Sequence, residues 1–504
     1  MATQVITLLV SFFSRTVFIK ILGSDYLGIN GLFSNILSIL SLVELGIGAS
    51  ITFSLYKPIA ENDYEKIAQL SNFFKKTYRL IAAVVAVIGL GFVPFIDFFV
   101  ETEEEIPHLT LYYLLILANT VVSYLWVYKS TLVSADQRYY ILRLNRFAFE
   151  LARQFFQIMI LCITHNYILY LLIQIACTIG SNLSISLRAD KLYPFLKNNK
   201  SVLPKLEQKR IFVSIKDVFL YRFGGTILSN TDNILISKII STAMVGLYSN
   251  YTLVSNSVGI FINLFFSSLT GSIGNLNAAE NRKESLKIYN LMSYISYWIF
   301  AFTAIALYSL LDDFIILWIS PEFSVGKLAV FAICLDYYLS GITQVNAIFR
   351  DTTGLFRQTK YIYLYASVIN IVLSIILGYK FGLGGIIVAT SLSRICTTVW
   401  FQPYIIFKHF FRTSPRNYIK TQIKYLFITA AAYIPVHLFN GVVGPVNTLS
   451  FAVKVLFTAI VPNAIILLLT FRTAEFKMLK ERITFIIDTK ILKNNSNHNS
   501  EEEA

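Results

Sequence analysis

Four arginines lie inside long apolar segments of this chain: Arg15, Arg153, Arg222 and Arg394. A charge near the centre of a bilayer costs at least about 2.5 to 3.5 kcal/mol on insertion scales, so it is retained only where a partner or a water-filled cavity receives it. The planar guanidinium donates two parallel hydrogen bonds and stays charged at any working pH, which suits a pyrophosphate or a carboxylate. The arginines therefore predict a cavity that binds an anionic headgroup, although a nearby carboxylate could instead neutralise each of them.

Polar faces on two apolar segments support this cavity. Residues seven and eleven positions apart share one face of a helix with 3.6 residues per turn. In the first segment this face carries Gln4, Ser11 and Arg15. At an offset of 218 residues the corresponding face carries Arg222, Ser229 and Asn233. We expect the two faces to line one chamber, and we predict that these residues bind the substrate together with Arg153 and Arg394.

Acidic residues inside the apolar segments are candidates for ion coupling. Asp232 lies in the polar stretch Ser229-Asn230-Thr231-Asp232-Asn233. Its carboxylate could bind a proton or sodium, or it could pair with an arginine of the cavity. Glu44 and Asp336 are further candidates for the same coupling. Glu150 lies one turn from Arg153 on one helix, so these two side chains could neutralise each other.

The composition indicates the elements that must position these residues. Hydrophobic residues make up 55% of the 504 residues and charged residues only 14%, too little polar surface to cover a soluble globule. A helix of about 20 apolar residues crosses roughly 30 Å of hydrocarbon. Fourteen such runs can be identified, near residues 2–22, 27–55, 80–100, 109–133, 145–164, 167–187, 215–237, 244–274, 288–311, 327–349, 361–380, 383–407, 421–440 and 449–471. We therefore predict an all-α integral membrane protein with about 14 transmembrane helices.

The basic residues are concentrated in alternate connections between these runs. The even-to-odd connections and the C-terminal tail hold 34 of the 43 basic residues. Short cytoplasmic loops collect lysine and arginine, so this pattern predicts that both termini face the cytoplasm. The formal net charge of +14 then reflects topology and attraction to anionic lipid rather than to nucleic acid.

An internal duplication is visible in the sequence. At an offset of 218, Ser24 aligns with Thr242 and Gly28 with Gly246, whereas the turn that begins at Ala60-Glu61-Asn62 recurs at an offset of 219. We infer that one residue was gained between these matches. Two like halves predict two bundles related by a pseudo-twofold axis, as in secondary transporters. The predicted parts are an N-terminal bundle (1–190), a cytoplasmic linker (191–214), a second bundle (215–411), two additional helices (412–471) and a basic cytoplasmic tail (472–504).

Motifs for enzymatic chemistry are missing from the sequence. There is no Gly-x-x-x-x-Gly-Lys-[Ser/Thr] phosphate loop, no His-Glu-x-x-His and no Gly-x-Ser-x-Gly. The four cysteines lie in apolar segments without close spacing and indicate neither a disulfide framework nor a metal site. We predict a protein that is not an enzyme and uses no cofactor and no metal.

Several runs resemble the polysaccharide flippases of bacterial capsule, exopolysaccharide and O-antigen pathways. The runs are Ser14-Arg15-Thr16-Val17-Phe18-Ile19-Lys20-Ile21-Leu22-Gly23, Tyr26-Leu27-Gly28-Ile29-Asn30-Gly31-Leu32-Phe33, Glu44-Leu45-Gly46-Ile47-Gly48 and Ser229-Asn230-Thr231-Asp232-Asn233-Ile234-Leu235-Ile236. The resemblance covers nearly the whole chain, and its motifs recur in several branches of one superfamily. That superfamily, the multidrug/oligosaccharidyl-lipid/polysaccharide exporters, also contains drug and toxin antiporters and peptidoglycan precursor flippases.

The resemblance implies a V-shaped pair of helix bundles in the bacterial cytoplasmic membrane. Such a protein flips polyprenyl-pyrophosphate-linked oligosaccharide repeat units by alternating access. The family's basic position on the first helix corresponds to Arg15, and its acidic position on the seventh helix to Asp232. The implied partners are the lipid-linked oligosaccharide, membrane lipids, and the polysaccharide polymerase and glycosyltransferases of the pathway, with no nucleic acid.

Other functions remain open from the sequence alone. Within the superfamily they are a cation-coupled antiporter of drugs or organic ions and a flippase of peptidoglycan lipid precursors. An alternative of another class is a membrane scaffold of the same pathway that transports nothing. An arginine-lined cavity favours transport of an anion, because a scaffold gains nothing from burying charge.

Overall fold

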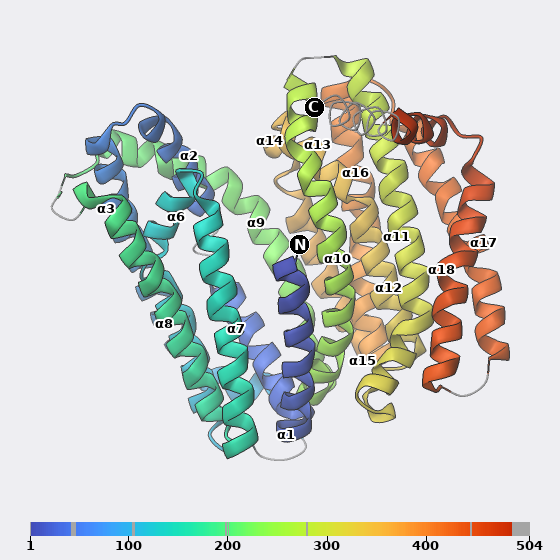
Figure 1. Cartoon of the computed structure of the whole chain (residues 1–504), viewed down its shortest axis with the longest axis horizontal. Helices are drawn as coiled ribbons and strands as arrows, with labels where there is room; N and C mark the ends of the chain where they lie inside the picture. Colours follow the sequence, from blue (N-terminus) through green and yellow to red (C-terminus); the bar gives the residue numbers. More distant parts are fainter. Residues whose placement is uncertain are drawn as a thin grey trace, which may run out of the picture. The chain divides into compact units, whose positions relative to one another are not determined.

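The computed structural model describes residues 2–41, 47–102, 106–196, 199, 201–278, 281–443 and 446–485. Almost all of these residues are helical, and none of them lies in a β-strand (Figure 1). Long apolar helices of this kind satisfy every backbone hydrogen bond internally, which is the requirement for crossing hydrocarbon. The predicted fold class, an all-α membrane protein, is confirmed.

The helices follow the duplication along the chain. The first copy contains α1 (Ala2–Leu40), α2 (Ile47–Ala60), α3 (Tyr64–Gly91), η2 (Val93–Phe95), α4 (Ile96–Phe99), α5 (Leu109–Tyr124), α6 (Val127–Ala135), α7 (Tyr139–Thr164) and α8 (Tyr167–Leu192). After η3 (Pro194–Leu196) come α9 (Lys205–Ile239), α10 (Thr242–Ala278), α11 (Arg282–Trp318), η4 (Pro321–Phe323), α12 (Lys327–Ile342), α13 (Gln344–Thr353) and α14 (Phe356–Thr359). The remaining elements are α15 (Ile362–Cys396), α16 (Thr398–Ile406), η5 (Phe407–Phe411), α17 (Arg416–Val442) and α18 (Thr448–Thr470).

Two of the long helices are interrupted where the sequence predicts a boundary between spans. By length and hydropathy, ten described helices could cross a membrane, and a bent pair, α5 with α6, could form an eleventh span. Two of the ten contain glycines with left-handed backbone, Gly23 in α1 (φ 85) and Gly382 in α15 (φ 60). Only glycine adopts such angles readily, so each break divides one long helix into two predicted spans. With α2 and α9 included, the described parts of the predicted apolar runs lie on these helices, and residues 42–46 of the second run lie outside the described residues.

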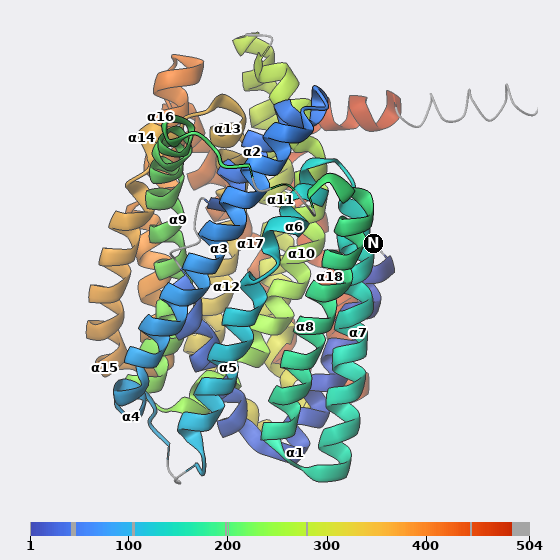
Figure 2. The same cartoon turned by 90° about the vertical axis from the view of Figure 1, so that its left-hand side faces the viewer.

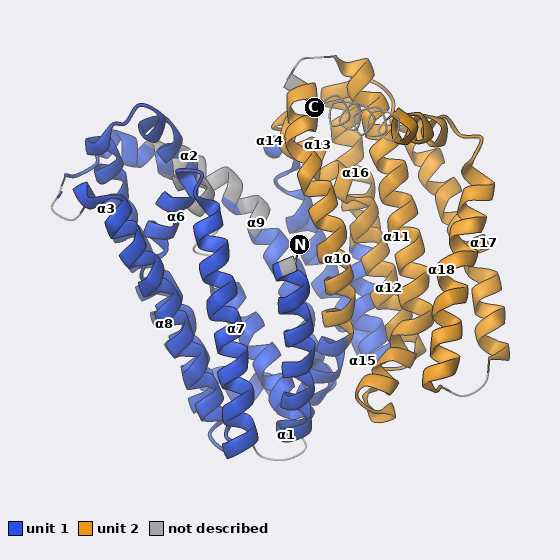
Figure 3. Cartoon of the chain, in the orientation of Figure 1, with its two compact units in different colours: residues 1–250, 356–393 blue, residues 251–355, 394–504 orange. Residues whose placement is uncertain are grey.

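The chain divides into two compact units (Figure 3). Unit 1 consists of residues 1–250 and 356–393, and unit 2 of residues 251–355 and 394–504. In unit 1, α3, α5, α8 and α7 stand in a row (Figure 2). The boundaries that we predicted from the duplication stay predictions.

The core of unit 2 is aromatic and contains satisfied polar groups. The ring of Tyr289 makes edge contacts with Phe349, Phe407 and Phe411. Its hydroxyl donates to Asn346 Oδ1 at 2.5 Å. Because both side chains are buried, this bond offsets the cost of desolvating their polar atoms.

Residues 474–485, in the predicted C-terminal tail, are also helical.

The two copies of the duplication touch each other inside unit 1. An ideal Cβ on Gly28 would lie 1.9 Å from the carbonyl oxygen of Thr242. A Cβ on Gly246 would lie 2.3 Å from the carbonyl oxygen of Ser24. At the offset of 218, Gly28 corresponds to Gly246 and Ser24 corresponds to Thr242. The two contacts are therefore the same contact, made once from each copy. This reciprocity supports the predicted pseudo-twofold relation at the level of individual atoms.

The helix ends show that the copies keep one register. Asp63 caps α3 by accepting a hydrogen bond from the backbone N–H of Lys66, and Asn281 caps α11 by accepting one from Glu284. Both the caps and the donors are 218 residues apart, as are the first residues of the two helices. The predicted gain of one residue before this turn is therefore wrong. The amino-acid types of this turn match at an offset of 219, whereas the capping residues and helix starts match at 218. Residues 279–280 of the second copy lie outside the described part.

Candidate functional site

Arg15 lies in the first segment of α1 and is half-buried. Its Nη1 donates a hydrogen bond to Ser249 Oγ of α10 at 3.2 Å. The hydroxyl of Ser249 donates in turn to the carbonyl oxygen of Gly246. Within the described part of the chain no carboxylate forms an ion pair with Arg15. One neutral hydroxyl therefore supports this guanidinium and leaves its charge uncompensated.

The polar face of α1 joins α7 through a chain of hydrogen bonds. Gln154 Nε2 donates to Ser11 Oγ at 3.0 Å and to Glu150 Oε1 at 2.8 Å. The same carboxylate pairs with Arg153, three residues further along α7. The charge of Arg153 is thus neutralised within its own helix, the alternative that the spacing had left open. Gln154 was not predicted, although its position one turn from Glu150 was a usable signal.

The polar face of α9 is only partly defined. The side chain of Arg222 lies outside the described residues, as does Glu44. Ser229 is exposed and Asn233 is half-buried. The Oδ1 atom of Asn233 is buried and has no hydrogen-bond partner, so it is available to a ligand or to water. Gln4, in the first turns of α1, is half-buried.

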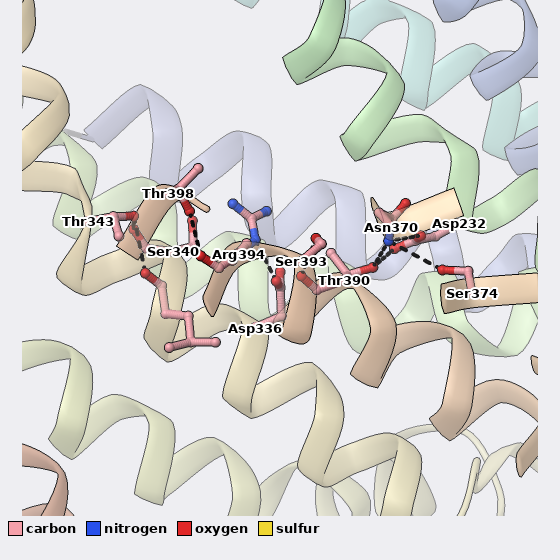
Figure 4. Close-up of polar contacts among 11 residues, drawn as sticks. Asp232, Asp336, Ser340, Thr343, Asn370, Ser374, Thr390, Ser393, Arg394 and Thr398 are labelled. Carbon is pink, nitrogen blue, oxygen red and sulfur yellow. Dashed lines mark hydrogen bonds and ion pairs between the residues drawn. The ribbon is translucent and has the colours of Figure 1, made fainter. Parts of the chain in front are cut away.

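Asp232 lies at the centre of a buried cluster of oxygen atoms in unit 1 (Figure 4). Its carboxylate accepts hydrogen bonds from Thr390 Oγ1 at 2.8 Å and from Asn370 Nδ2 at 3.4 Å. Asn370 Nδ2 also lies 2.8 Å from Thr390 Oγ1 and 3.3 Å from Ser374 Oγ. The hydroxyl of Ser374 donates to the backbone carbonyl of Ile386 at 3.3 Å. Four of these five residues are polar and buried in an otherwise apolar region.

The break in α15 brings these groups together. Asn370 and Ser374 lie before Gly382, and Ile386 and Thr390 lie after it, each pair spaced by one helical turn. Asn370 Oδ1 is buried without a hydrogen-bond partner. Carboxylate, amide, hydroxyl and backbone oxygens are the ligands that hard cations prefer, and broken helices are where transporters hold coupling ions. The cluster can thus hold a small cation or a proton.

Arg394 and Asp336, both predicted site residues, bind each other in unit 2. Arg394 Nε donates to Asp336 Oδ1 at 2.6 Å (Figure 4). Their side chains are 16% and 25% exposed, so the pair is partly shielded from water. Mutual neutralisation explains how both charges are retained within the apolar segments.

A further buried ion pair was missed from the sequence. Lys454 lies in the apolar helix α18, and its side chain is only 7% exposed. Its Nζ lies 2.7 Å from Asp313 Oδ2. The neighbouring Asp312 accepts hydrogen bonds from Tyr251 and Ser324. Two adjacent carboxylates are thus satisfied by partners that sequence periodicity could not identify.

These pairings single out Arg15. Arg153, Arg394 and Lys454 each have a carboxylate partner. Of the candidate site arginines whose side chains the structure describes, Arg15, Arg153 and Arg394, Arg15 is the one without a carboxylate partner. An uncompensated guanidinium attracts an anion and can donate to it in pairs.

The long apolar helices and their intramembrane charged groups define an all-helical membrane protein with many spans. The sequence profile of the MatE family matches residues 1–159. A search of curated protein sequences finds no significant match. The profile covers the part of the chain that carries Arg15 and most of α7, whereas Ser249, which accepts the hydrogen bond of Arg15, lies outside the matched residues.

Solved transporter structures share the fold over 79% to 94% of this chain. The Lipid II flippase MurJ in an inward closed conformation superposes with a TM-score of 0.69 and 15% identity, covering 94% of this chain and 98% of that one. An inward-facing multidrug resistance MATE family transporter of the MOP superfamily gives 0.62 and 12%, covering 79% and 94%. A Vibrio cholerae MATE transporter gives 0.54 and 10%, covering 81% and 96%. At these identities the likeness shows the fold; with the MatE match it supports the predicted exporter superfamily.

Proposed function

We propose that this protein flips polyprenyl-pyrophosphate-linked oligosaccharide across the cytoplasmic membrane. The observation that carries the proposal is the guanidinium of Arg15, which has no ion pair among the described residues and hydrogen-bonds there to the neutral hydroxyl of Ser249. A pyrophosphate presents the paired anionic oxygens that a guanidinium binds most strongly. The glycan would occupy the polar faces of α1 and α9, while the lipid tail stays in the bilayer.

A second candidate substrate is a peptidoglycan lipid precursor. The likeness to the Lipid II flippase MurJ favours it, because that likeness extends over 94% of this chain. Both candidates combine a lipid pyrophosphate with a sugar, so Arg15 would serve either one. Export of organic cations is less well supported, since an unpaired arginine repels them.

We also propose that the cluster around Asp232 couples transport to sodium or protons. Its support is the concentration of oxygen atoms beside a buried carboxylate at a helix break. A cation bound there would replace the hydrogen bonds that Thr390 and Asn370 now donate to the carboxylate. Binding would therefore change how the two segments of α15 are held against α9.

A reconstituted flipping assay tests the substrate class. The purified protein is placed in vesicles that contain a fluorescent polyprenyl-pyrophosphate oligosaccharide, a peptidoglycan lipid precursor or a fluorescent organic cation, and reagent accessibility measures translocation. We expect movement of one or both glycolipids and none of the cation. Movement of the cation alone would establish the antiporter, and movement of none of the three would favour a scaffold. The ratio of the two glycolipid rates identifies the preferred substrate.

The coupling proposal predicts the behaviour of Asp232→Asn. The amide keeps the shape but removes the charge, so transport should lose its response to a sodium or proton gradient and slow by about tenfold. Asp97→Asn, at an exposed position in α4, is the matched control and should behave like wild type. The measurement is the initial flipping rate with and without each gradient. A gradient response preserved in Asp232→Asn would exclude this cluster as the coupling site.

A further inference from the structure

A basic pocket lies beside the middle of α3, apart from the charged and polar groups described above. It is formed by residues 72–80 and 201–208 and has a volume of about 630 Å³. That size falls within the roughly 300 to 1,000 Å³ typical of small-molecule sites. Lys75, Lys76 and Arg79 line it, and none of its lining residues is acidic. The pocket therefore combines a volume of small-molecule size with charge of a single sign.

The three cations of this pocket are not neutralised within the described part of the chain. None of them forms an ion pair there, whereas the nearby Lys66 pairs with Glu207 of α9. Lys76 and Arg79 are exposed and Lys75 is half-buried. Like charges one turn apart repel each other, so an anion bound between them would relieve that repulsion.

Hydrogen bonds hold the second wall of the pocket in place. The side-chain amide of Asn72 donates to the carbonyl oxygens of Asn199 at 2.8 Å and Ser201 at 3.2 Å. Gln208 Nε2 donates to the carbonyl oxygen of Leu203 at 2.7 Å. The segment that leads into α9 is thus fastened to α3, and the pocket is part of the folded unit.

The second copy of the duplication lacks these cations. At the offset of 218 their places are taken by Ser293, Tyr294 and Tyr297, and both tyrosines are completely buried. The pocket at this position of α11 measures about 400 Å³ and is lined by Asn290, Ser293 and Glu475. The second copy therefore folds without positive charge at these positions. Packing of the helix does not explain why the first copy has three cations there.

The basic pocket is also lined by exposed apolar side chains. Leu80 and Val202 line it and are 65% and 66% exposed. Leu80 also begins the apolar run that we predict to cross the membrane, so the cations lie at the depth of the headgroups. An occupant that suits the pocket has an anionic group beside a hydrocarbon chain.

We propose that this pocket binds the phosphate group of an anionic phospholipid, with Arg79 donating paired hydrogen bonds and Lys75 and Lys76 supplying point charges. The acyl chains of the lipid would extend past Leu80 into the bilayer. A bound lipid would tie the segment before α9 to the membrane surface.

Lipid binding to the full-length protein in detergent tests the proposal. Native mass spectrometry compares short-chain phosphatidylglycerol with phosphatidylcholine of the same chain length and with inorganic phosphate. We expect one tightly bound phosphatidylglycerol. Its affinity should fall by about a hundredfold in the triple variant Lys75→Gln, Lys76→Gln, Arg79→Gln. The matched control carries Arg416→Gln, Lys420→Gln and Lys424→Gln on α17, which remove the same charge from exposed positions and should leave this affinity unchanged.

Each remaining outcome counts against the proposal. Equal loss in both triple variants would indicate general surface charge, and undiminished binding in the pocket variant would place the lipid elsewhere. Tight binding of inorganic phosphate without phosphatidylglycerol would assign the pocket to a soluble phosphate compound. Hydrogen exchange of the unmutated protein provides a test that needs no variant. Exchange at residues 201–208 should slow with phosphatidylglycerol only, and unchanged exchange would overturn the assignment.

Discussion

Replacing Arg15 with alanine is expected to reduce glycolipid flipping by about a hundredfold or more, while the protein still inserts and folds. The guanidinium makes one hydrogen bond, to Ser249, and no ion pair within the described part of the chain, so its removal leaves no buried carboxylate unpaired. The loss should therefore fall on substrate binding. Arg15→Lys keeps a point charge but not the planar pair of donors and should retain only part of the rate.

The flipping rate in vesicles, compared at equal amounts of inserted protein, measures this effect. Arg416→Ala is the matched control, because it makes the same chemical change at an exposed position of α17. We expect wild-type flipping from it. Full activity in Arg15→Ala would show that the pyrophosphate does not depend on this residue, and the proposed function would then lose the observation that carries it.

Gly28→Ala and Gly246→Ala should each force the two copies of the duplication apart. The added methyl groups would lie 1.9 Å and 2.3 Å from backbone carbonyl oxygens, far inside van der Waals contact. A carbonyl of a helix cannot rotate away as a flexible side chain can, so the helices themselves must separate. We expect a fall in the melting temperature of the purified protein of at least several degrees for each variant, with loss of flipping.

Gly271→Ala provides the control on the same helix as Gly246. Nothing lies within 4 Å of a Cβ at this position. Alanine is a better helix former than glycine by about 1 kcal/mol, so this variant should be neutral or slightly more stable. If all three variants melted alike, close packing at Gly28 and Gly246 would not be holding the copies together.

The repeat and the spans were predictable because they depend on local patterns. Apolar runs long enough to cross a membrane, and breaks at Gly23 and Gly382, follow from composition and from the backbone freedom of glycine. The register of the repeat was less secure. Identical residue types at an offset of 219 indicated an inserted residue. The helix caps Asp63 and Asn281, however, are 218 residues apart. A capping position depends on hydrogen-bond geometry, which neighbouring residue types can satisfy equally well.

The candidate site was predicted in its charges but not in its partners. The sequence indicated Asp232 as a candidate for ion coupling because it is an acidic residue in an apolar helix, and that role stays a prediction. The residues that surround it were missed, because Asn370 is 138 residues away and Thr390 is 158 residues away. Their own signal was weak, since single polar residues in apolar helices often serve only for packing.

The sequence by itself determined that this is a duplicated membrane protein with many spans, and that it carries arginines in apolar segments, where an uncompensated charge is costly. Only the tertiary structure decided which of those charges are already compensated. Arg394 forms an ion pair with Asp336, 58 residues away, and Lys454 forms one with Asp313, 141 residues away. Arg15 instead donates a hydrogen bond to the hydroxyl of Ser249. The physical reason is that hydropathy and helical periodicity are properties of neighbouring residues, whereas neutralising a charge depends on which helices pack together.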